Sequence, residues 1–356
     1  MGEFINPADV PKVKFYTGDE APCIGMGTFG SDRFTADQIA EAVDGAIKSG
    51  YRMFDCAACY GNEPEIGKVF KNAFDEGIVE RKDLFIMTKV WNDMHEHVEE
   101  ACKKSIADLQ CDYVDMYYIH WPFPNYHAPK CDVESRNPDS KPFSVEEFMD
   151  TYRQCEELVE KGKIRYIGCS NFSGWHLMKS LSVSERYGWS RYVAQQVYYS
   201  LLNREFEWEL MPLGIDQKVG AIIWSPLSAG RLGGKYRRNN PIPTDGRVAR
   251  GGSPIPDEAT SYERLYDIVE VLEQVAEETG HSVAQCALNW LLQRPTVSSL
   301  IIGARTEEQL RQNLEAVGWN LSPEQVKRLD MASQTTPIYP YWHQAQFPEL
   351  NSQLRF

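Results

Sequence analysis

Eight short runs of β-forming residues alternate along this chain with segments whose apolar residues recur at helical spacing. The predicted strands span residues 23–26, 51–55, 84–88, 113–120, 164–168, 192–197, 221–224 and 299–302. The clearest helical segments span residues 35–50, 65–77, 96–110, 144–162 and 261–280. Strands that alternate with helices form parallel sheets, and eight parallel strands can close on themselves. The chain is therefore predicted to be an α/β protein with a (β/α)8 TIM barrel.

Two connections are longer than ordinary strand-to-helix loops. The segment 121–143 follows the fourth strand and has five prolines, and the segment 229–258 follows the seventh strand and has six Arg or Lys. Both leave the carboxyl ends of strands, where barrel enzymes have their sites. The residues before the first strand are predicted to form a lid or hairpin. Because no linker divides the sequence, we expect a single domain over residues 1–356.

Charge and cysteine usage narrow the classes of partner. A net charge of −14 opposes binding to phosphate backbones, so nucleic acid is not expected as a partner. No apolar stretch has the length of a signal peptide or a membrane span, so no membrane association is expected. The nine cysteines are scattered, a pattern typical of reduced thiols, and the predicted location is cytoplasmic. The oligomeric state is not indicated.

Three short motifs suggest other chemistry. The stretch "GMGTFG", residues 25–30, matches a dinucleotide-binding fingerprint, but too few apolar residues precede it and the next helix begins too late. The Cys-x-x-Cys of residues 56–59 has no second ligand pair, so it is predicted to be two small side chains packed beside a strand end. The "HEH" of residues 95–97 is predicted to be the exposed start of a helix. No metal site is expected.

Four polar residues mark the ends of three neighbouring strands. Asp55 ends the second strand, with Tyr60 in the loop after it, Lys89 ends the third and His120 ends the fourth. Each alone has a structural explanation, but all four together at one rim of a barrel point to chemistry. A free tyrosine has a pKa of about 10, and a nearby ammonium lowers that value by roughly 1–3 units. The set is suited to giving a proton to a carbonyl oxygen, with Tyr60 as the acid and a hydride donor as the second requirement.

The surroundings of these residues resemble the aldo-keto reductase family. The stretches "GYRMFDCAACYGNEPEIGKVF", "FIMTKVW" and "DYVDMYYIHWP" resemble the family's catalytic segments, and the likeness covers about residues 22–331. The resemblance implies a barrel that uses a nicotinamide cofactor. It also implies that Tyr60 is the general acid, Lys89 tunes it, Asp55 is the charge partner of Lys89, and His120 orients the carbonyl. A C-terminal tail, residues 335–356, is implied at the catalytic rim.

The same resemblance implies the cofactor contacts. They are Gly27, Thr28, Asp55, Ser170, Asn171, Gln196, Trp224, Ser225, Leu227, Gly230, Lys235, Gly303, Arg305, Gln309 and Asn313. Ser170, Asn171 and Gln196 would hold the carboxamide, and Trp224 would stack on the nicotinamide ring.

The segment "IIGARTEEQLRQN" departs from better-known members of the family. Gly303-Ala304 replaces a Lys–Ser pair and Gln309 replaces an Arg. Arg305 remains as the cation for the adenosine 2′-phosphate. NADP(H) is therefore the expected cofactor, and NAD(H) stays open.

The substrate is expected to be a small-molecule carbonyl compound. Phe29, Trp91 and Trp121 are predicted to line its pocket, with the tail aromatics buried above them. Aldehydes or ketones, including sugar-derived ones, are the expected substrates. Two alternatives remain open: oxidation of a sugar or polyol by the same chemistry, and a non-catalytic, cofactor-sensing subunit.

Overall fold

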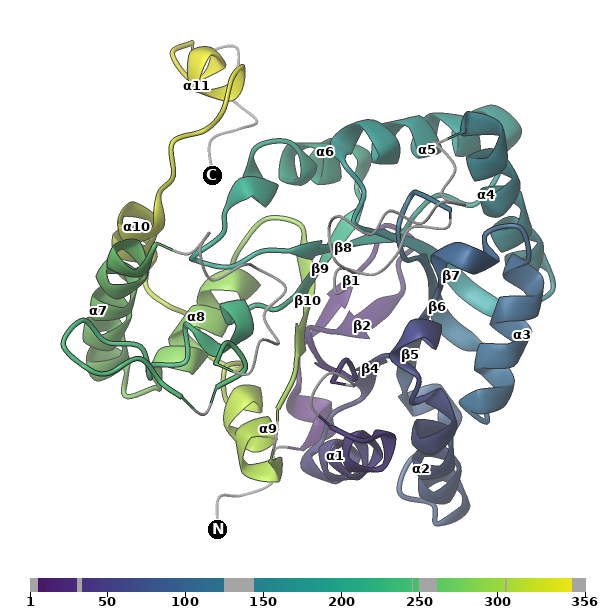
Figure 1. Cartoon of the computed structure of the whole chain (residues 1–356), viewed down its shortest axis with the longest axis horizontal. Helices are drawn as coiled ribbons and strands as arrows, with labels where there is room; N and C mark the ends of the chain where they lie inside the picture. Colours follow the sequence, from purple (N-terminus) through teal and green to yellow (C-terminus); the bar gives the residue numbers. More distant parts are fainter. Residues whose placement is uncertain are drawn as a thin grey trace.

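The computed structural model describes residues 6–30, 34–124, 144–244, 246–249, 261–304 and 306–347. Eight parallel strands form a closed barrel in the order β10-β3-β4-β5-β6-β7-β8-β9 (Figure 1). The strands are β3 (Ile24–Gly27), β4 (Met53–Asp55), β5 (Phe85–Val90), β6 (Val114–Ile119), β7 (Ile164–Ser170), β8 (Ala194–Tyr198), β9 (Gly220–Trp224) and β10 (Val297–Ile302). The predicted fold class is confirmed, and each predicted strand matches a barrel strand to within two residues at either end.

Helices surround the barrel. They are α1 (Ala36–Ser49), α2 (Glu63–Asp75), α3 (Val98–Asp108), α4 (Val145–Glu160), α5 (Gly174–Tyr187), α6 (Leu210–Gln217), α7 (Tyr262–Thr279), α8 (Val283–Leu292), α9 (Glu307–Leu314), α10 (Pro323–Ser333) and α11 (Tyr341–Gln344). The five predicted helices correspond to α1, α2, α3, α4 and α7. The others were not predicted.

Helix α1 shows how local sequence sets these elements. Thr35 begins it with a capping box, in which the side chains of Thr35 and Gln38 each accept the other's backbone N–H. Gly50 ends it in the left-handed conformation (φ 106°), which is easy only for glycine. Between these caps, residues such as Val43 and Ile47 are buried against the barrel.

A hairpin closes the barrel at the amino ends of its strands. Strands β1 (Lys12–Lys14) and β2 (Glu20–Pro22) pair antiparallel, which confirms the predicted hairpin. Phe15 follows β1, and its ring centroid lies 6.1 Å from that of Phe85 and 6.1 Å from that of Tyr166. These rings belong to the apolar cluster inside the barrel. Because this end is filled, access to the barrel interior is left to the opposite rim, at the carboxyl ends.

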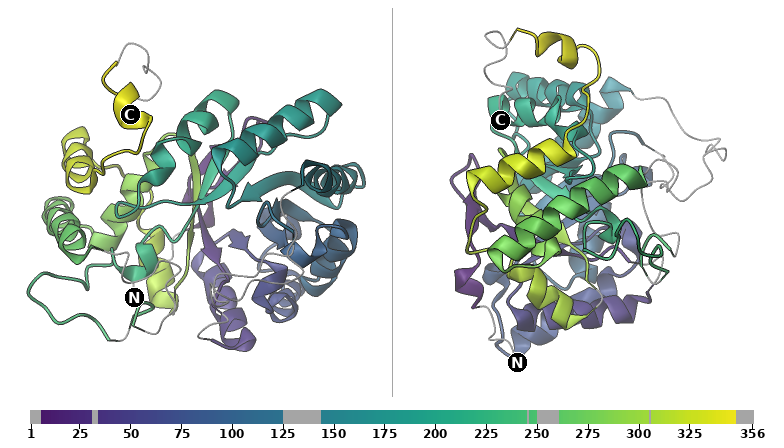
Figure 2. Two further views of the ribbon diagram at one scale, coloured as in Figure 1. Left: turned by 45° about the horizontal axis from the view of Figure 1, so that its top comes forward. Right: turned by 90° about the vertical axis from the view of Figure 1, so that its left-hand side faces the viewer.

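The tail differs from its prediction. After α10 the chain runs extended to the single-turn helix α11, which stands apart from the helices around the barrel (Figures 1 and 2). Tyr339, Trp342 and Phe347 are 72%, 45% and 46% exposed, so the expected burial of the tail aromatics is wrong for these three. Tyr341 interacts electrostatically with Glu209, which precedes α6 on the side of the strands' carboxyl ends. This contact puts the described part of the tail on the side of the strands' carboxyl ends, as predicted; residues 348–356, with Phe356, are outside the described residues.

Within the described parts of the chain, no helix is both long enough and apolar enough to cross a membrane. Most of the connection 121–143 and residues 250–258 of the other long connection fall outside the described residues.

Candidate active site

The four predicted catalytic residues lie at the carboxyl ends of adjacent strands. Asp55 is the last residue of β4, Lys89 is the next-to-last residue of β5, and His120 directly follows β6. Tyr60 ends the short 3-10 helix η2 (Ala58–Tyr60) after β4. Because β4, β5 and β6 are neighbours in the barrel, residues far apart in sequence meet at one place.

Lys89 is the centre of this cluster. Its Nζ donates to both carboxylate oxygens of Asp55 at 2.8 Å and to the backbone oxygen of Cys56 at 2.8 Å. The Tyr60 hydroxyl lies 3.3 Å from the same Nζ. The Lys89 side chain is 0% exposed and that of Asp55 is 4% exposed. Burial alone would lower the pKa of Lys89, but the Asp55 carboxylate raises it above its ordinary value. The lysine is therefore an ammonium at neutral pH, aimed at the phenol.

Tyr60 departs from the expected acidity. Burial raises the pKa of its phenol, and the Lys89 charge lowers it by less than burial raises it. The sequence-based expectation of a lowered pKa is wrong in its net sign, although the direction of the Lys89 contribution is as expected. The consequence is that Tyr60 holds its proton throughout the neutral range and is available as a donor.

His120 is an uncharged imidazole between two aromatic rings. Burial lowers its pKa well below the usual range, and the charges of Lys89 and His95 lower it further. Its ring centroid lies 5.1 Å from that of Trp91 and 6.0 Å from that of Tyr60, edge-on in both pairs. A neutral imidazole can donate one hydrogen bond without placing a second positive charge beside Lys89.

A line of hydrogen bonds joins this cluster to the residues predicted to hold the carboxamide. The Gln196 side chain donates to Asp55 Oδ1 at 2.8 Å, and Ser170 Oγ donates to the Gln196 backbone oxygen at 3.1 Å. Asn171 donates to Ser170 Oγ at 3.2 Å and to the backbone oxygen of His120 at 3.0 Å. The structure thus brings Ser170, Asn171 and Gln196 together on the same rim, and it adds a Gln196–Asp55 bond that sequence analysis missed.

The first barrel strand closes the other side of the cluster. The Thr28 hydroxyl donates to the Asp55 backbone oxygen at 2.9 Å. A Cβ at Gly27 would lie 2.7 Å from Ile301, so only glycine fits there without a shift. Asn62, which was not predicted, donates to the Thr28 backbone oxygen at 2.9 Å and ties the loop that holds Tyr60 to this strand.

Glu63 is a second residue that sequence analysis missed. It begins α2 and is buried, and its carboxylate accepts hydrogen bonds from Thr88 Oγ1 and Ser105 Oγ. Burial raises the pKa of this carboxyl. Asn62 and Glu63 together fix the loop that holds Tyr60. The available signal was a pair of polar residues that follows Tyr60 and Gly61, at the start of an amphipathic helix.

Four predicted cofactor contacts, Ser225, Leu227, Gly230 and Lys235, lie in the loop that follows β9, and we call residues 225–240 the covering loop. Trp224, just before it, is half-buried and stacks on Tyr198 with ring centroids 4.7 Å apart, a partner that was not predicted. Ser225, Ser228 and Ala229 have left-handed backbone angles (φ 54°, 49° and 57°). Such conformations are costly for residues with a side chain and cluster at ligand-binding sites.

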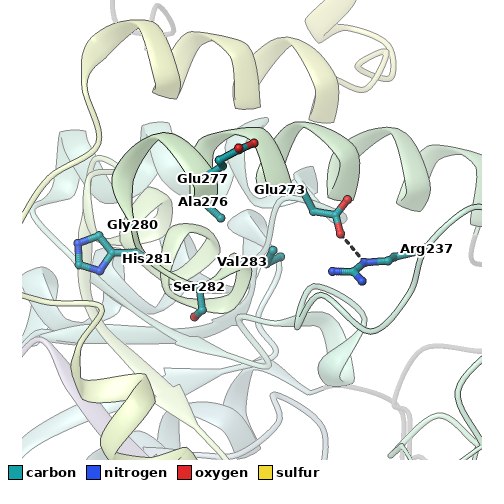
Figure 3. A pocket seen from close by; sticks show the side chains of 8 residues that line it. All are labelled: Arg237, Glu273, Ala276, Glu277, Gly280, His281, Ser282 and Val283. Carbon is teal, nitrogen blue, oxygen red and sulfur yellow. Dashed lines mark hydrogen bonds and ion pairs between the residues drawn. The ribbon is translucent and has the colours of Figure 1, made fainter. Parts of the chain in front are cut away.

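Ion pairs join the covering loop to α7. Arg237 pairs with Glu273, and Arg238 pairs with Glu263, Asp267 and Glu270. Beside them is an open surface hollow of about 720 Å³, lined by Arg237, Glu273, Ala276, Glu277, Gly280, His281, Ser282 and Val283 (Figure 3). It contains none of the predicted site residues.

The other predicted contacts are placed as follows. Leu227 is half-buried, and Gly230 and Lys235 are exposed on the covering loop. Gly303 is exposed after β10, and Gln309 and Asn313 are half-buried on α9.

Arg305 is outside the described residues. Among the predicted pocket residues, Phe29 lies 5.1 Å from the Tyr60 ring, Trp91 contacts His120, and Trp121 is half-buried next to His120 in sequence.

The structure also places the Cys-x-x-Cys motif of residues 56–59 and the "HEH" motif of residues 95–97. Cys56 is buried and Cys59 is exposed, and both are free thiols. The described residues contain no group of three or more His, Cys, Asp or Glu that could hold a metal ion. His95 is buried, so its predicted exposure is wrong, whereas Glu96 and His97 are exposed as predicted. Burial lowers the pKa of His95 to about 4.

Comparisons with known proteins identify the family and agree with the fold. The aldo/keto reductase family model matches residues 23–334. The chain is 32% identical over 318 residues to an NADP-dependent D-sorbitol-6-phosphate dehydrogenase of Malus domestica, covering 88% of this chain and 91% of that protein. It is 31% identical over 333 residues to an NAD(P)H-dependent D-xylose reductase of Candida tropicalis, covering 90% and 91%. The solved aldose reductase of Schistosoma japonicum superimposes with a TM-score of 0.70 at 25% identity, over 92% of this chain and 94% of that one. This chain therefore belongs to the aldo/keto reductase family.

Proposed function

We propose that this protein reduces an aldehyde or ketone to the alcohol with NADPH, and that Tyr60 supplies the proton. The observation that supports this most is the buried Asp55–Lys89–Tyr60 unit at the strand ends, next to a neutral His120. A complete set of this kind argues against the non-catalytic alternative, because a cofactor-sensing subunit does not need a positioned proton donor.

Each residue of the set has one role in the proton transfer. NADPH, when bound, would supply the hydride for the carbonyl carbon. The Tyr60 hydroxyl donates its proton to the carbonyl oxygen as negative charge develops there. Lys89, 3.3 Å from the phenol oxygen, stabilises the phenolate that remains. Asp55 keeps Lys89 charged and aimed. His120 donates a hydrogen bond to the same carbonyl oxygen and so orients the substrate.

The residues on the rim suit a nicotinamide dinucleotide. Ser170, Asn171 and Gln196 offer the hydroxyl and amide groups that a carboxamide needs, beside the cluster. Trp224 is half-buried, with one side of its ring stacked on Tyr198, and the other side would take the nicotinamide. The covering loop would lie on the pyrophosphate.

The choice between NADP(H) and NAD(H) depends on the residues that would bind the adenosine end of the cofactor. Arg305 would pair with the 2′-phosphate, which favours NADP(H). The lack of a second cation at Gly303 and Gln309 leaves NAD(H) usable. The names of relatives support the use of either cofactor, since one relative is named NADP-dependent and another NADH-dependent.

The substrate class is small carbonyl compounds, with sugars and sugar-derived aldehydes as the first candidates. Two relatives are named for sugar chemistry, a D-xylose reductase and a D-sorbitol-6-phosphate dehydrogenase. The second name favours testing the oxidative direction as well. Phe29, Trp91 and Trp121 would form the apolar wall beside the reacting carbon.

The remaining features of the proposal concern the whole chain. We place it as one barrel domain, with a core over about residues 22–331 and the tail at 335–356. The eight described cysteines are free, in keeping with a cytoplasmic location. The charge of −14 disfavours nucleic acid as a partner.

A carbonyl panel tests the function. Aldoses, short aldehydes and ketones would be mixed with NADPH or NADH, and turnover followed by the loss of reduced-cofactor absorbance; polyols with the oxidised cofactors form the reverse arm. Reduction of at least one carbonyl class, faster with NADPH, is the expected result. Cofactor binding without turnover of any carbonyl or polyol would contradict the proposal.

A further inference from the structure

One side-chain contact at the rim has no role in the chemistry described so far. The sulfur of Cys59 lies 3.7 Å from Nδ1 of His120. Cys59 as a whole is exposed to solvent. Its sulfur, however, contacts the side chain of His120, a residue that is only 9% exposed. The thiol belongs to η2, immediately before Tyr60, so it reaches His120 from the same loop that holds the proposed acid.

The protonation states of the two groups decide what this contact can do. Burial raises the pKa of the Cys59 thiol to about 12, so the sulfur keeps its proton. The pKa of His120 is far below its usual range, so the ring has a single N–H. Both pKa values, that of the thiol and that of the imidazole, therefore disfavour a reactive pair of thiolate and imidazolium. What remains is a neutral S–H donor facing a neutral ring nitrogen.

A neutral imidazole places its one proton on either nitrogen, and the partner of one nitrogen sets the state of the other. We propose that Cys59 is a positioning residue whose S–H donates to Nδ1 of His120 and so keeps the ring proton on Nε2. Nε2 is then the nitrogen that can donate to a substrate carbonyl. The tautomer itself does not depend on the proposed function, whereas its effect on turnover does.

The neighbours of His120 limit how its ring can be oriented and protonated. Trp91 and Tyr60 meet the ring edge-on, with interplanar angles of 80° and 76°. Asn171 holds the backbone oxygen of His120 at 3.0 Å. Turning the ring by half a rotation would place a C–H at the thiol and lose the hydrogen bond. Lys89 and His95, the charged and titratable groups that act on this ring, both disfavour a second ring proton.

Nitrogen-15 NMR of histidine-labelled enzyme reads the tautomer directly. The chain has seven histidines, and a His120→Gln variant identifies the signals of His120 by their loss. The parent should show a protonated Nε2 and an unprotonated Nδ1. Cys59→Ala should shift the signals toward a mixture of tautomers, and Cys59→Ser, which restores a donor, should move them back. Cys111→Ala is the matched control, because Cys111 is also a free thiol and its sulfur faces the Ile106 backbone oxygen instead.

Kinetics complete the test. Cys59→Ala should lower kcat/KM for carbonyl reduction by about two- to fivefold, the range of one weak hydrogen bond, with unchanged NADPH affinity. Parent-like nitrogen signals in Cys59→Ala would overturn the inference. A shifted tautomer with unchanged kcat/KM would uphold the positioning role and count against the carbonyl-orienting role of His120.

Discussion

The two sides of the catalytic rim are built in opposite ways. The catalytic cluster of Asp55, Tyr60, Lys89 and His120 stands at or just after the ends of buried strands, and within it Lys89 bonds to Asp55 and Tyr60. The covering loop, residues 225–240, contains three non-glycine residues with left-handed backbone angles. Its Arg237 and Arg238 are joined to α7 by ion pairs at the surface.

This difference indicates how the two sides divide their tasks. Strand ends cannot shift without breaking the barrel's hydrogen bonds, so the geometry of proton transfer is permanent. Leu232 and Tyr236 anchor the covering loop in the core. Beyond them, exposed ion pairs are weak and screened by salt, so the end of the loop around Arg237 and Arg238 is expected to move more easily than the strand ends. Changes in the catalytic cluster should therefore alter turnover, and changes around the loop should alter cofactor affinity.

The largest effect is expected at Tyr60. Tyr60→Phe removes only the hydroxyl, so turnover should fall by roughly 10²–10⁴-fold, the usual contribution of a general acid, while NADPH affinity changes little. Steady-state kinetics with a fluorescence titration of NADPH measure both. Turnover close to the parent's would remove Tyr60 from the mechanism.

On the cofactor side, Arg305→Ala should weaken NADPH binding by roughly 10–150-fold, because a charge-assisted bond to a phosphate contributes about 1.5–3 kcal/mol. NADH binding should change much less. Dissociation constants for both cofactors provide the check. If both rise equally, Arg305 does not recognise the 2′-phosphate.

Lys89→Met should lower kcat/KM by roughly 10–10²-fold, because the phenol loses the charge that lowers its pKa by ~1–3 units. Reduction needs the protonated phenol, so activity falls as pH rises through the pKa of Tyr60. Since that pKa is already raised by burial and rises further without Lys89, the alkaline decline should move to higher pH in the variant.

A second variant separates this effect from unfolding. Lys89→Met alone leaves the buried Asp55 carboxylate without its partner, which is strongly destabilising. The double variant Asp55→Asn/Lys89→Met removes both charges and should recover thermal stability but not activity. A pH–rate profile identical to the parent's in either variant would contradict the tuning role.

The smallest effect is expected at the ion pairs of the covering loop. Arg238→Gln removes three pairs and should raise the NADPH dissociation constant by about two- to fivefold at low salt, with the gap closing as salt screens the parent's pairs. Arg153→Gln is the matched control, since Arg153 makes similar exposed pairs on α4. An Arg238→Gln affinity equal to that of the control would mean that the pairs do not hold the loop.

Sequence alone predicted the parts of the molecule that depend on local pattern. All eight strands were predicted, and the four residues of the proposed catalytic cluster do lie together, because strand periodicity and strand-end residues can be read along the chain. Helix α8 was missed because seven of its ten residues are buried and none is exposed, which removes the polar face that marks an amphipathic helix. Helix α5 was missed because three serines interrupt its apolar spacing.

What depends on long-range contact could not be predicted. The Gln196–Asp55 bond joins residues 141 positions apart, and the Trp224–Tyr198 stack depends on strand register. The net sign of the Tyr60 pKa and the burial of His95 were wrong for the same reason, because the depth of a side chain is a property of the packed barrel.

The division of tasks between the catalytic cluster and the covering loop can be tested most directly with one variant of each. Both variants would be measured for turnover and for cofactor affinity. Tyr60→Phe and Arg238→Gln would be compared for single-turnover reduction at saturating NADPH and for NADPH affinity at low salt. The account predicts a crossed pattern: Tyr60→Phe loses reduction and keeps affinity, and Arg238→Gln keeps reduction and loses affinity. If either variant loses both properties together, the two sides do not act separately and the account is contradicted.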